Sequence, residues 1–278
     1  MKHGKFGLIG HPINHSLSPA LFKAAYGGRY TYDLIEGEDF EKSYERFLKE
    51  YDAINVTAPF KELAFRKADR STPECQAMGA ANILLKRDNE VIAANSDHMG
   101  VIRSVMAGLY PDKVINTLAL VVGGGGAAKA ATYAMCSCGY QVVIINRNYE
   151  KAKDFAQILE ENPEFKIQAR PLEEFRKWFR KAGAVIYTLP VGIPVLGNLS
   201  RRDIRGGLLT RKTKILVEAN YKNPAFTPGI LNSMKSINPH LTYVGGTEWL
   251  LHQAVGAYLA FTGEEPDIEG MRAAIKEI

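Results

Sequence analysis

Four consecutive glycines, Gly123–Gly126, constrain this chain more than any other feature of its sequence. They follow a short apolar segment, Leu118–Val122, and they precede Ala127–Met135, whose composition favours a helix. The glycines fit the pattern G-x-G-x-x-A, in which Gly123 and Gly125 hold the two glycine positions. A buried strand, a glycine turn and a helix in this order predict a parallel βαβ unit.

The glycines also predict a ligand. Backbone N–H groups can approach a pyrophosphate closely only where no side chain intervenes, and the N-terminus of a helix adds partial positive charge. A turn without a ligand would carry the conformational cost of four glycines for no gain. We therefore expect Gly123, Gly125, Gly126 and Ala127 to bind the pyrophosphate of a dinucleotide.

The residues after the next expected strand, 141–145, indicate which dinucleotide binds. An NAD site places an acidic residue there to hold the 2′-hydroxyl of the ribose. This chain instead has Asn146 and Arg147, followed by Lys151 one helical turn later. A basic pair attracts a 2′-phosphate, so the sequence predicts NADP, bound by these three residues. The alternative is a solvated basic surface.

Length and composition narrow the class of protein. A chain of 278 residues favours two domains, and 46% hydrophobic residues suffice for a sizeable core. A net charge of +5 is too small to indicate nucleic-acid binding but suits a small anion. The chain has three cysteines and no His or Cys pair that would complete a set of metal ligands. We therefore expect reduced thiols, no bound metal and a cytoplasmic location. We expect neither a signal peptide nor a membrane span.

Short β-rich segments alternate with helical ones on both sides of residue 98. Before it, strands or hairpin arms are expected at 5–9, 30–35, 53–56, 81–86 and 91–95, and helices at 19–26 and 39–49. After it, strands are expected at 118–122, 141–145, 167–169, 184–189 and 214–219, and helices at 98–109, 127–138, 150–160, 173–181, 249–262 and 268–276. The alternation predicts a two-domain α/β fold, with an N-terminal α/β domain and a Rossmann-type doubly wound domain.

Polar segments in the N-terminal part carry the most specific motifs. Residues 10–19 read GHPINHSLSP, residues 55–61 read NVTAPFK, residues 79–82 read GAAN and residues 95–97 read NSD. With the glycine loop, this order of motifs resembles the shikimate dehydrogenase family over nearly the whole chain. The resemblance implies the NADPH-dependent, reversible reduction of 3-dehydroshikimate to shikimate in aromatic amino-acid biosynthesis. It also implies a small-molecule substrate, and a monomer or homodimer.

The resemblance also implies roles for single residues. Lys61 and Asp97 would form the catalytic pair. The carboxylate and hydroxyls of the substrate would be bound by Ser16, Ser18, Thr57, Asn82, Tyr221 and Gln253. Gly246 would belong to the cofactor site.

The residue types suit this chemistry. Directed hydrogen bonds from Ser, Thr, Asn and Gln identify a polyhydroxylated ring better than an apolar pocket does. An ammonium group can stabilise the negative charge that hydride transfer leaves on a ketone oxygen, and can supply a proton. Burial would lower the pKa of Lys61 and the Asp97 carboxylate would raise it, so Lys61 is either an acid–base catalyst or a fixed cation. By itself, Ser18 before Pro19 would be a helix N-cap.

The expected position of Gln253 predicts the division of the chain. Because this residue would join substrate-binding residues near the N-terminus, the C-terminal helices should belong to the first domain. We expect a substrate-binding domain at 1–98, completed by helices at 247–278. An NADP-binding domain at 99–246 would be inserted between them.

Three departures from the family pattern fall near the expected nicotinamide site. Tyr187 replaces the Asn of N-A-T-P-x-G, the segment Glu218–Pro224 is one residue longer than D-x-x-Y-x-P, and Trp249 replaces a Met. These changes predict an atypical pocket. They keep two alternatives open: a quinate/shikimate dehydrogenase of broader specificity, and a non-catalytic NADP-binding sensor on the same scaffold.

Overall fold

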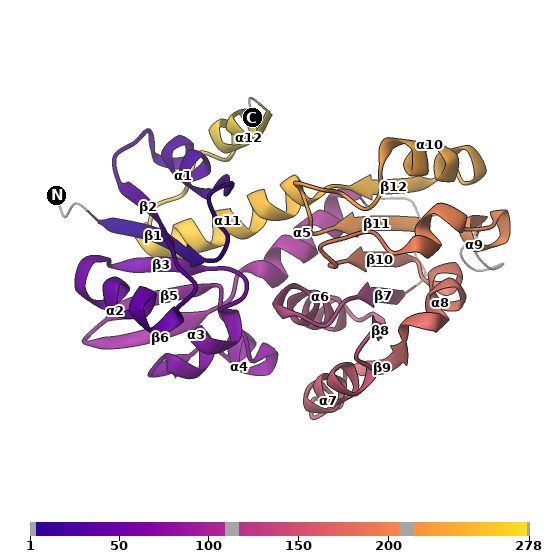
Figure 1. Ribbon diagram of the computed structural model, residues 1–278, viewed down its shortest axis with the longest axis horizontal. Coiled ribbons are helices and arrows are strands. Elements are labelled where there is room, and N and C mark those ends of the chain that lie inside the picture. The colour runs from indigo at the N-terminus through magenta and orange to yellow at the C-terminus, as the bar shows by residue number, and fades with distance from the viewer. Residues whose placement is uncertain (1–3, 109–116, 206–213, 277–278) are drawn as a thin grey trace. The chain divides into compact units, whose positions relative to one another are not determined.

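The computed structural model describes residues 4–108, 117–205 and 214–276, and the chain divides into two compact units. Unit 1 comprises Met1–Asp97 and Leu251–Ile278, and unit 2 comprises His98–Leu250. Each unit contains one six-stranded sheet with helices packed on it (Figure 1). The α/β fold predicted from the sequence is confirmed.

Unit 1 is built on a mixed sheet with strand order β2-β1-β3-β5-β6-β4. Its elements are β1 (Lys5–Gly10), α1 (Ser18–Tyr26), β2 (Thr31–Glu36), α2 (Phe40–Glu50), β3 (Ala53–Val56), α3 (Lys61–Lys67), β4 (Arg70–Ser71), α4 (Pro73–Met78), β5 (Ile83–Arg87), β6 (Glu90–Ala94), the C-terminal part of α11 (Gly246–Thr262) and α12 (Ile268–Lys276). Strand β5 runs antiparallel to both β3 and β6, and the other pairs are parallel.

Local sequence explains the helix and turn positions in unit 1. Asp39 caps α2 because its side chain accepts from the N–H groups of Glu41 and Lys42. The apolar face of α2 then joins a buried cluster on the sheet. The β5–β6 hairpin turns at Asp88 and Asn89, both with positive φ, which these residue types tolerate.

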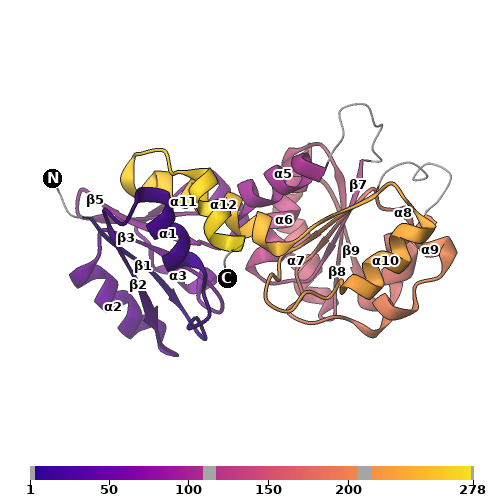
Figure 2. The same ribbon diagram turned by 90° about the horizontal axis from the view of Figure 1, so that it is seen from above.

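The C-terminal helices pack against α1, and α1 and α12 lie side by side (Figures 1 and 2). The Tyr258 hydroxyl on α11 donates to the Ser18 carbonyl at 3.0 Å. The N–H of Asp267 donates to the carbonyl of Ala25, also at 3.0 Å. Part of α11 is thereby fixed beside the loop that precedes α1.

Unit 2 is built on an all-parallel sheet with strand order β12-β11-β10-β7-β8-β9. Its elements are α5 (Asp97–Gly108, from residue 98), β7 (Leu118–Val122), α6 (Gly126–Ser137), β8 (Gln141–Asn146), α7 (Tyr149–Leu159), β9 (Lys166–Pro171), η1 (Leu172–Glu174), α8 (Phe175–Lys181), β10 (Ala184–Tyr187), η2 (Pro194–Asn198), α9 (Arg201–Arg205), β11 (Lys214–Glu218), α10 (Pro228–Ile237), β12 (Leu241–Val244) and the start of α11. The expected end of α5 at residue 109 lies outside the described residues.

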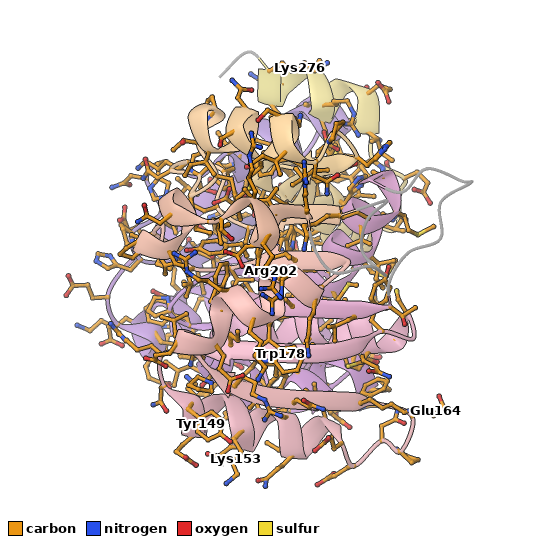
Figure 3. The ribbon with its side chains drawn as sticks, turned by 90° about the vertical axis from the view of Figure 1, so that its right-hand side faces the viewer. Tyr149, Lys153, Glu164, Trp178, Arg202 and Lys276 are labelled. Atoms are coloured by element: carbon orange, nitrogen blue, oxygen red, sulfur yellow. The ribbon has the colours of Figure 1, made fainter. Side chains whose placement is uncertain are left out.

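This sheet is doubly wound. Helices α6 and α7 cover one face, and α8, α9 and α10 cover the other (Figure 2). Because both faces are covered, the central strands are mostly apolar, and β10 and β11 are buried over their whole length. On α7, Lys153 lies at the surface (Figure 3), whereas Phe155 and Leu159 are buried towards the sheet. The strand order reverses at β7, where doubly wound proteins bind their ligands.

The helices of the described residues are all too short or too polar to cross a membrane.

Lys214, the first residue of β11, is fully buried in unit 2. Its ammonium donates to the carbonyls of Phe179 and Ala182 at the C-terminal end of α8, the second bond measuring 2.7 Å. Carbonyls at a helix C-terminus attract a cation, but burial lowers the pKa of Lys214 to about 7. This lysine therefore makes the stability of unit 2 depend on pH.

We predict that Lys214→Met removes part of the pH dependence of unfolding. The pKa of Lys214 is about 7 in the fold but about 10.4 in an unfolded chain. Between these values only the unfolded chain binds the proton, so the wild type gains up to about 1.4 kcal/mol of unfolding free energy per unit rise in pH. Urea unfolding of both proteins at pH 7 and pH 9 measures this. If the unfolding free energies of the two proteins changed equally between pH 7 and pH 9, Lys214 would not titrate in this range.

Candidate functional site

Two helix N-termini bring Lys61 and Asp97 together in unit 1. Lys61 is the first residue of α3 and Asp97 is the first residue of α5. The Lys61 Nζ donates to Asp97 Oδ2 at 2.6 Å. The Asp97 side chain is 1% exposed and that of Lys61 is 16% exposed. A lysine has three N–H donors and Asp97 occupies one of them, so the ammonium has donors left for a ligand.

Asn82 fixes the other oxygen of Asp97. Its amide Nδ2 donates to Asp97 Oδ1 at 3.0 Å and to Ser96 Oγ at 3.0 Å, and its Oδ1 accepts from the Ser96 N–H at 2.8 Å. Asn95 Oδ1 accepts from the Asp97 N–H at 2.9 Å. Both carboxylate oxygens and the backbone of Asp97 are therefore held in place. Sequence reasoning included Asn82 but missed Asn95, although Asn95 stands in the same NSD motif as Asp97.

Ser16 and Ser18 form a second polar cluster in unit 1. The Ser16 Oγ donates to Ser18 Oγ at 3.1 Å and accepts from the Ser18 N–H at 3.2 Å. The N-cap of α1 is Leu17, and Ser18 is the first helical residue. The predicted N-cap role of Ser18 is therefore wrong, because α1 already begins at Ser18 and the N-cap position falls on Leu17.

Thr57 lies against the loop that follows β1. Its N–H donates to the carbonyl of Ile9 at 2.9 Å, and its carbonyl accepts from the N–H of Phe60 at 3.0 Å. A Cβ on Gly10 would lie 2.4 Å from Thr57 Cγ2, so the glycine permits this close approach. Gln253 is half-buried on the part of α11 that belongs to unit 1, whereas Tyr221 belongs to unit 2.

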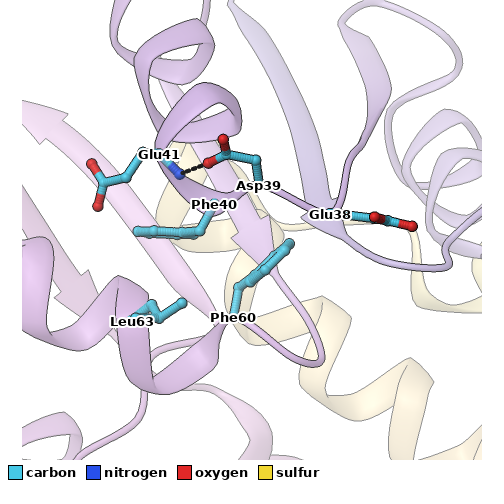
Figure 4. A pocket seen from close by; sticks show the side chains of 6 residues that line it. All are labelled: Glu38, Asp39, Phe40, Glu41, Phe60 and Leu63. Carbon is cyan, nitrogen blue, oxygen red and sulfur yellow. Dashed lines mark hydrogen bonds between the residues drawn. The ribbon is translucent and has the colours of Figure 1, made fainter.

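A shallow hollow of about 460 Å³ lies between α2 and α3, beside Phe60. Its walls combine acidic and aromatic side chains (Figure 4), and its lining residues are Glu38, Asp39, Phe40, Glu41, Phe60 and Leu63. None of the residues predicted for the site lines it. We assign it no part in the candidate site.

The glycine loop of unit 2 connects β7 to α6. Gly123 has a φ of 131°, and a Cβ there would lie 2.2 Å from Thr188 Oγ1. Gly125 is the N-cap of α6, which has no side-chain cap, and a Cβ there would meet open space. Gly126 and Ala127 are the first two residues of α6. The loop thus leaves a helix N-terminus uncovered by side chains, as an anion site requires.

The basic residues predicted for the cofactor lie beside this loop, at the end of β8. Asn146 is the last residue of β8, and a Cβ on Gly124 would lie 2.4 Å from its Nδ2. Arg147 is exposed immediately after the strand. Lys151 is exposed in the first turn of α7, whose N-cap Asn148 accepts from the Lys151 N–H at 3.1 Å.

Gly246 packs against the loop that follows β11. A Cβ on Gly246 would lie 2.6 Å from the Ala219 carbonyl oxygen and 2.7 Å from the Tyr221 nitrogen. Trp249 is 3% exposed, and a Cβ on Gly100 would lie 2.6 Å from its indole ring. Trp249 is therefore buried and lies against α5 at Gly100.

Tyr187 and the segment that begins at Glu218 were predicted from the sequence to make the pocket atypical, and the structure buries both of these side chains fully. The Tyr187 hydroxyl donates to the carbonyl of Val191 at 2.7 Å. The Glu218 carboxylate accepts from the Tyr243 hydroxyl at 2.8 Å. Sequence reasoning missed their role because a replaced residue at a strand end does not reveal which way its side chain points.

Two family models match the chain. The shikimate dehydrogenase substrate binding domain matches residues 8–84, and shikimate / quinate 5-dehydrogenase matches residues 110–203. The chain belongs to the shikimate dehydrogenase family. It is an oxidoreductase of that family, with a Rossmann-like domain, and the resemblance seen in its motifs is confirmed.

Relatives of the family are similar over almost the whole chain. The shikimate dehydrogenase (NADP(+)) of Thermus thermophilus is 29% identical over 98% of this chain and 97% of its own. The pentafunctional AROM polypeptide of Eremothecium gossypii is 31% identical over 93% of this chain, which spans only 17% of that polypeptide.

Solved structures give the same result. The shikimate 5-dehydrogenase of Thermus thermophilus, in complex with NADP(H) and shikimate, is 27% identical with a TM-score of 0.78 and covers 98% of both chains. The quinate dehydrogenase of Corynebacterium glutamicum, in complex with NAD, is 22% identical with a TM-score of 0.81, over 99% of both chains. At 22% identity, the similarity to this second structure shows only that the two proteins share a fold.

We predict that Gly123→Ala and Gly125→Ala have different effects on stability. Alanine at 123 would adopt a φ that disfavours side chains and clash with Thr188, costing roughly 3 kcal/mol or more. Alanine at 125 meets open space and costs about 1 kcal/mol as a poorer N-cap. Thermal unfolding of both variants measures the difference. Equal losses of stability would contradict the contact between Gly123 and Thr188.

Proposed function

We propose that this protein catalyses the NADP-dependent, reversible reduction of 3-dehydroshikimate to shikimate. One observation carries the proposal: the Lys61 ammonium lies 2.6 Å from the buried Asp97 carboxylate, which Asn82 also holds. Relatives 29% identical to this chain are named shikimate dehydrogenase (NADP(+)). The structure from Thermus thermophilus, 27% identical, contains NADP(H) and shikimate. These similarities support the substrate and the cofactor.

We assign substrate binding to residues 1–98 and 247–278, and NADP binding to residues 99–246. The compact units support this assignment because they divide the chain close to these boundaries, at 97/98 and 250/251. Gln253 then lies in the same unit as Ser16 and Ser18.

The residues of unit 2 fit NADP. Open space at Gly125 and the side-chain-free N-terminus of α6 suit a pyrophosphate. Gly123, Gly126 and Ala127 complete the turn, and Gly246 shapes the neighbouring loop. Arg147 and Lys151, with Asn146, would hold the 2′-phosphate. When bound, NADP exchanges a hydride with the substrate at its nicotinamide ring.

The residues of unit 1 fit a polyhydroxylated carboxylic acid. Ser16 and Ser18 present paired hydroxyls to the substrate carboxylate. Thr57, Asn82 and Gln253 supply a hydroxyl and two amides for the carboxylate or the ring hydroxyls. Tyr221 of unit 2 would contribute a phenol. Such a set recognises substrate hydroxyls by directed hydrogen bonds.

Lys61 performs the proton chemistry in this proposal. During reduction its ammonium lies beside the carbonyl oxygen, stabilises the negative charge that develops there and donates a proton to it. During oxidation the same nitrogen receives the proton of the alcohol. Asp97 keeps the ammonium in place, since its Oδ2 accepts from Lys61 while its Oδ1 is held by Asn82.

The cysteines support a reducing compartment, and we propose that the enzyme works in the cytoplasm. Cys75, Cys136 and Cys138 are all free thiols. Burial raises the pKa of Cys75 and of Cys136 to about 12, so both stay protonated and unreactive.

Initial rates with shikimate and with quinate, each with NADP and NAD, test the proposed function. We expect shikimate with NADP to be the fastest pair, by at least about tenfold. Rapid oxidation of quinate would support an enzyme of broader specificity. Tight NADP binding without turnover of either acid would support a sensor.

In the same assay Arg147→Ala should raise the KM for NADP and leave the KM for NAD unchanged.

We predict that Lys61→Ala lowers kcat by roughly 10²-fold or more while changing KM much less, because the lost group acts mainly in the transition state. Steady-state kinetics with shikimate and NADP measure both constants. Lys67→Ala is a matched control, since Lys67 ends the same helix and pairs with Glu41 at the surface. A near-normal kcat for Lys61→Ala would remove this lysine from the mechanism.

A further inference from the structure

Three loops of unit 2 follow neighbouring strands at the carboxyl edge of the sheet. The glycine loop follows β7, residues 188–193 follow β10 and residues 219–227 follow β11. The residues proposed to hold the 2′-phosphate follow β8, on the other side of β7. A dinucleotide with its pyrophosphate at β7 and its adenosine half over β8 must extend its nicotinamide half over β10 and β11.

Tyr187 ties together both ends of the loop after β10. Its hydroxyl donates to the Val191 carbonyl at 2.7 Å and accepts from the Ile193 N–H at 3.1 Å. The residue is fully buried, and burial raises the pKa of its phenol to about 12, so the hydroxyl keeps the proton that it donates. Thr188 anchors the start of the loop, because its Oγ1 donates to the Val122 carbonyl at 2.8 Å.

Glu218 does the same for the loop after β11. Its carboxylate accepts from the N–H groups of Ala225 and Phe226, which lie at the far end of that loop. It also accepts from the Tyr243 hydroxyl on β12 at 2.8 Å. A fully buried carboxylate is tolerated only with such partners, so this arrangement resists opening.

The two loops are also fastened to each other. Tyr187 and Glu218 are register partners on β10 and β11. Asn220 Nδ2 donates to the Pro190 carbonyl at 2.8 Å. The rings of Tyr187 and Phe226 meet edge to face, with centroids 5.5 Å apart. The loops therefore form one braced wall, with buried side chains on its inner side.

The outer side of this wall carries an exposed apolar side chain. Val191, whose carbonyl Tyr187 holds, is 66% exposed. An apolar side chain held out to solvent on a fixed backbone offers a surface to an aromatic ring without the cost of ordering a loop on binding.

We propose that Tyr187 and Glu218 are positioning residues for hydride transfer, which keep the wall of residues 188–193 and 219–226 rigid against the nicotinamide half of the cofactor. The proposal rests on the proposed NADP-dependent function. A displacement of about 1 Å between reacting atoms can slow a reaction 10²-fold, so a loosened wall slows this step without removing a catalytic group.

Single-turnover kinetics of Tyr187→Phe and Glu218→Gln test the proposal. Enzyme loaded with one equivalent of NADPH per site is mixed with excess 3-dehydroshikimate, and the loss of NADPH absorbance is followed. The amplitude of the fast phase counts competent sites, and its rate constant reports the hydride-transfer step. We expect a wild-type amplitude and a rate constant lowered about tenfold or more. A merely structural role would lower the amplitude and leave the rate constant unchanged, which would overturn the proposal.

Matched controls come from polar groups outside the wall. Tyr44→Phe also loses a buried hydroxyl, which donates to the Lys67 carbonyl at 3.4 Å, and Asp203→Asn also alters a buried acid of unit 2, which accepts from the Ser200 N–H at 3.0 Å. Both should keep the wild-type rate constant. A loss as large as that of Tyr187→Phe would overturn the proposal.

Amide hydrogen exchange gives a readout that does not need activity. The N–H groups of Ile193, Ala225 and Phe226 donate to the two bracing side chains. We expect faster exchange at Ile193 in Tyr187→Phe, and at the other two in Glu218→Gln. Unchanged exchange would show that the wall does not depend on these side chains.

The wild-type trace separates the two proposals. If wild-type enzyme shows no turnover, the proposed function fails and this inference fails with it. If the wild type turns over and Tyr187→Phe has the wild-type rate constant, the proposed function stands and only the positioning role is overturned.

Discussion

A charged group can be buried only if hydrogen bonds and opposite charges replace the water that it loses. This constraint shapes the functional end of each unit. In unit 1 the Asp97 carboxylate is 1% exposed and is satisfied by Lys61 and Asn82. In unit 2 the Glu218 carboxylate is fully buried and is satisfied by two backbone N–H groups and a phenol. Each acid gathers groups that are distant in sequence and fixes their positions.

The two acids differ in what they gather. Asp97 holds a charge, the ammonium of Lys61, on a side chain that is 16% exposed. Glu218 holds backbone and so sets the shape of a loop. Asp97 positions a side chain that can exchange protons, whereas Glu218 positions the backbone of a loop. The same requirement for partners therefore serves chemistry in unit 1 and geometry in unit 2.

Sequence patterns predicted the α/β class, the family and the strand edges that carry the candidate residues. Long apolar runs and the glycine turn have strong local signals, since only buried parallel strands and a tight turn accommodate them. Several elements were missed: α3, α4, α9, α10, β4 and β12 have no expected counterpart. The shortest of them, such as β4 and α9, depend on tertiary contacts more than on their own sequence, whereas α4 and α10 each follow a threonine N-cap and begin with a proline. The packing of Tyr187 against Phe226 could not be predicted either, since the two residues are far apart in the chain.

The bonds of Glu218 have a consequence for how this chain can change over generations. A loop whose far end is fastened to the side chain at its near end cannot change length freely. Inserting or deleting a residue between 219 and 224 would move the N–H groups of Ala225 and Phe226 away from the carboxylate. A tolerated change of length then requires a compensating acid of different reach at 218. The length of the loop and the identity of residue 218 are therefore expected to change together.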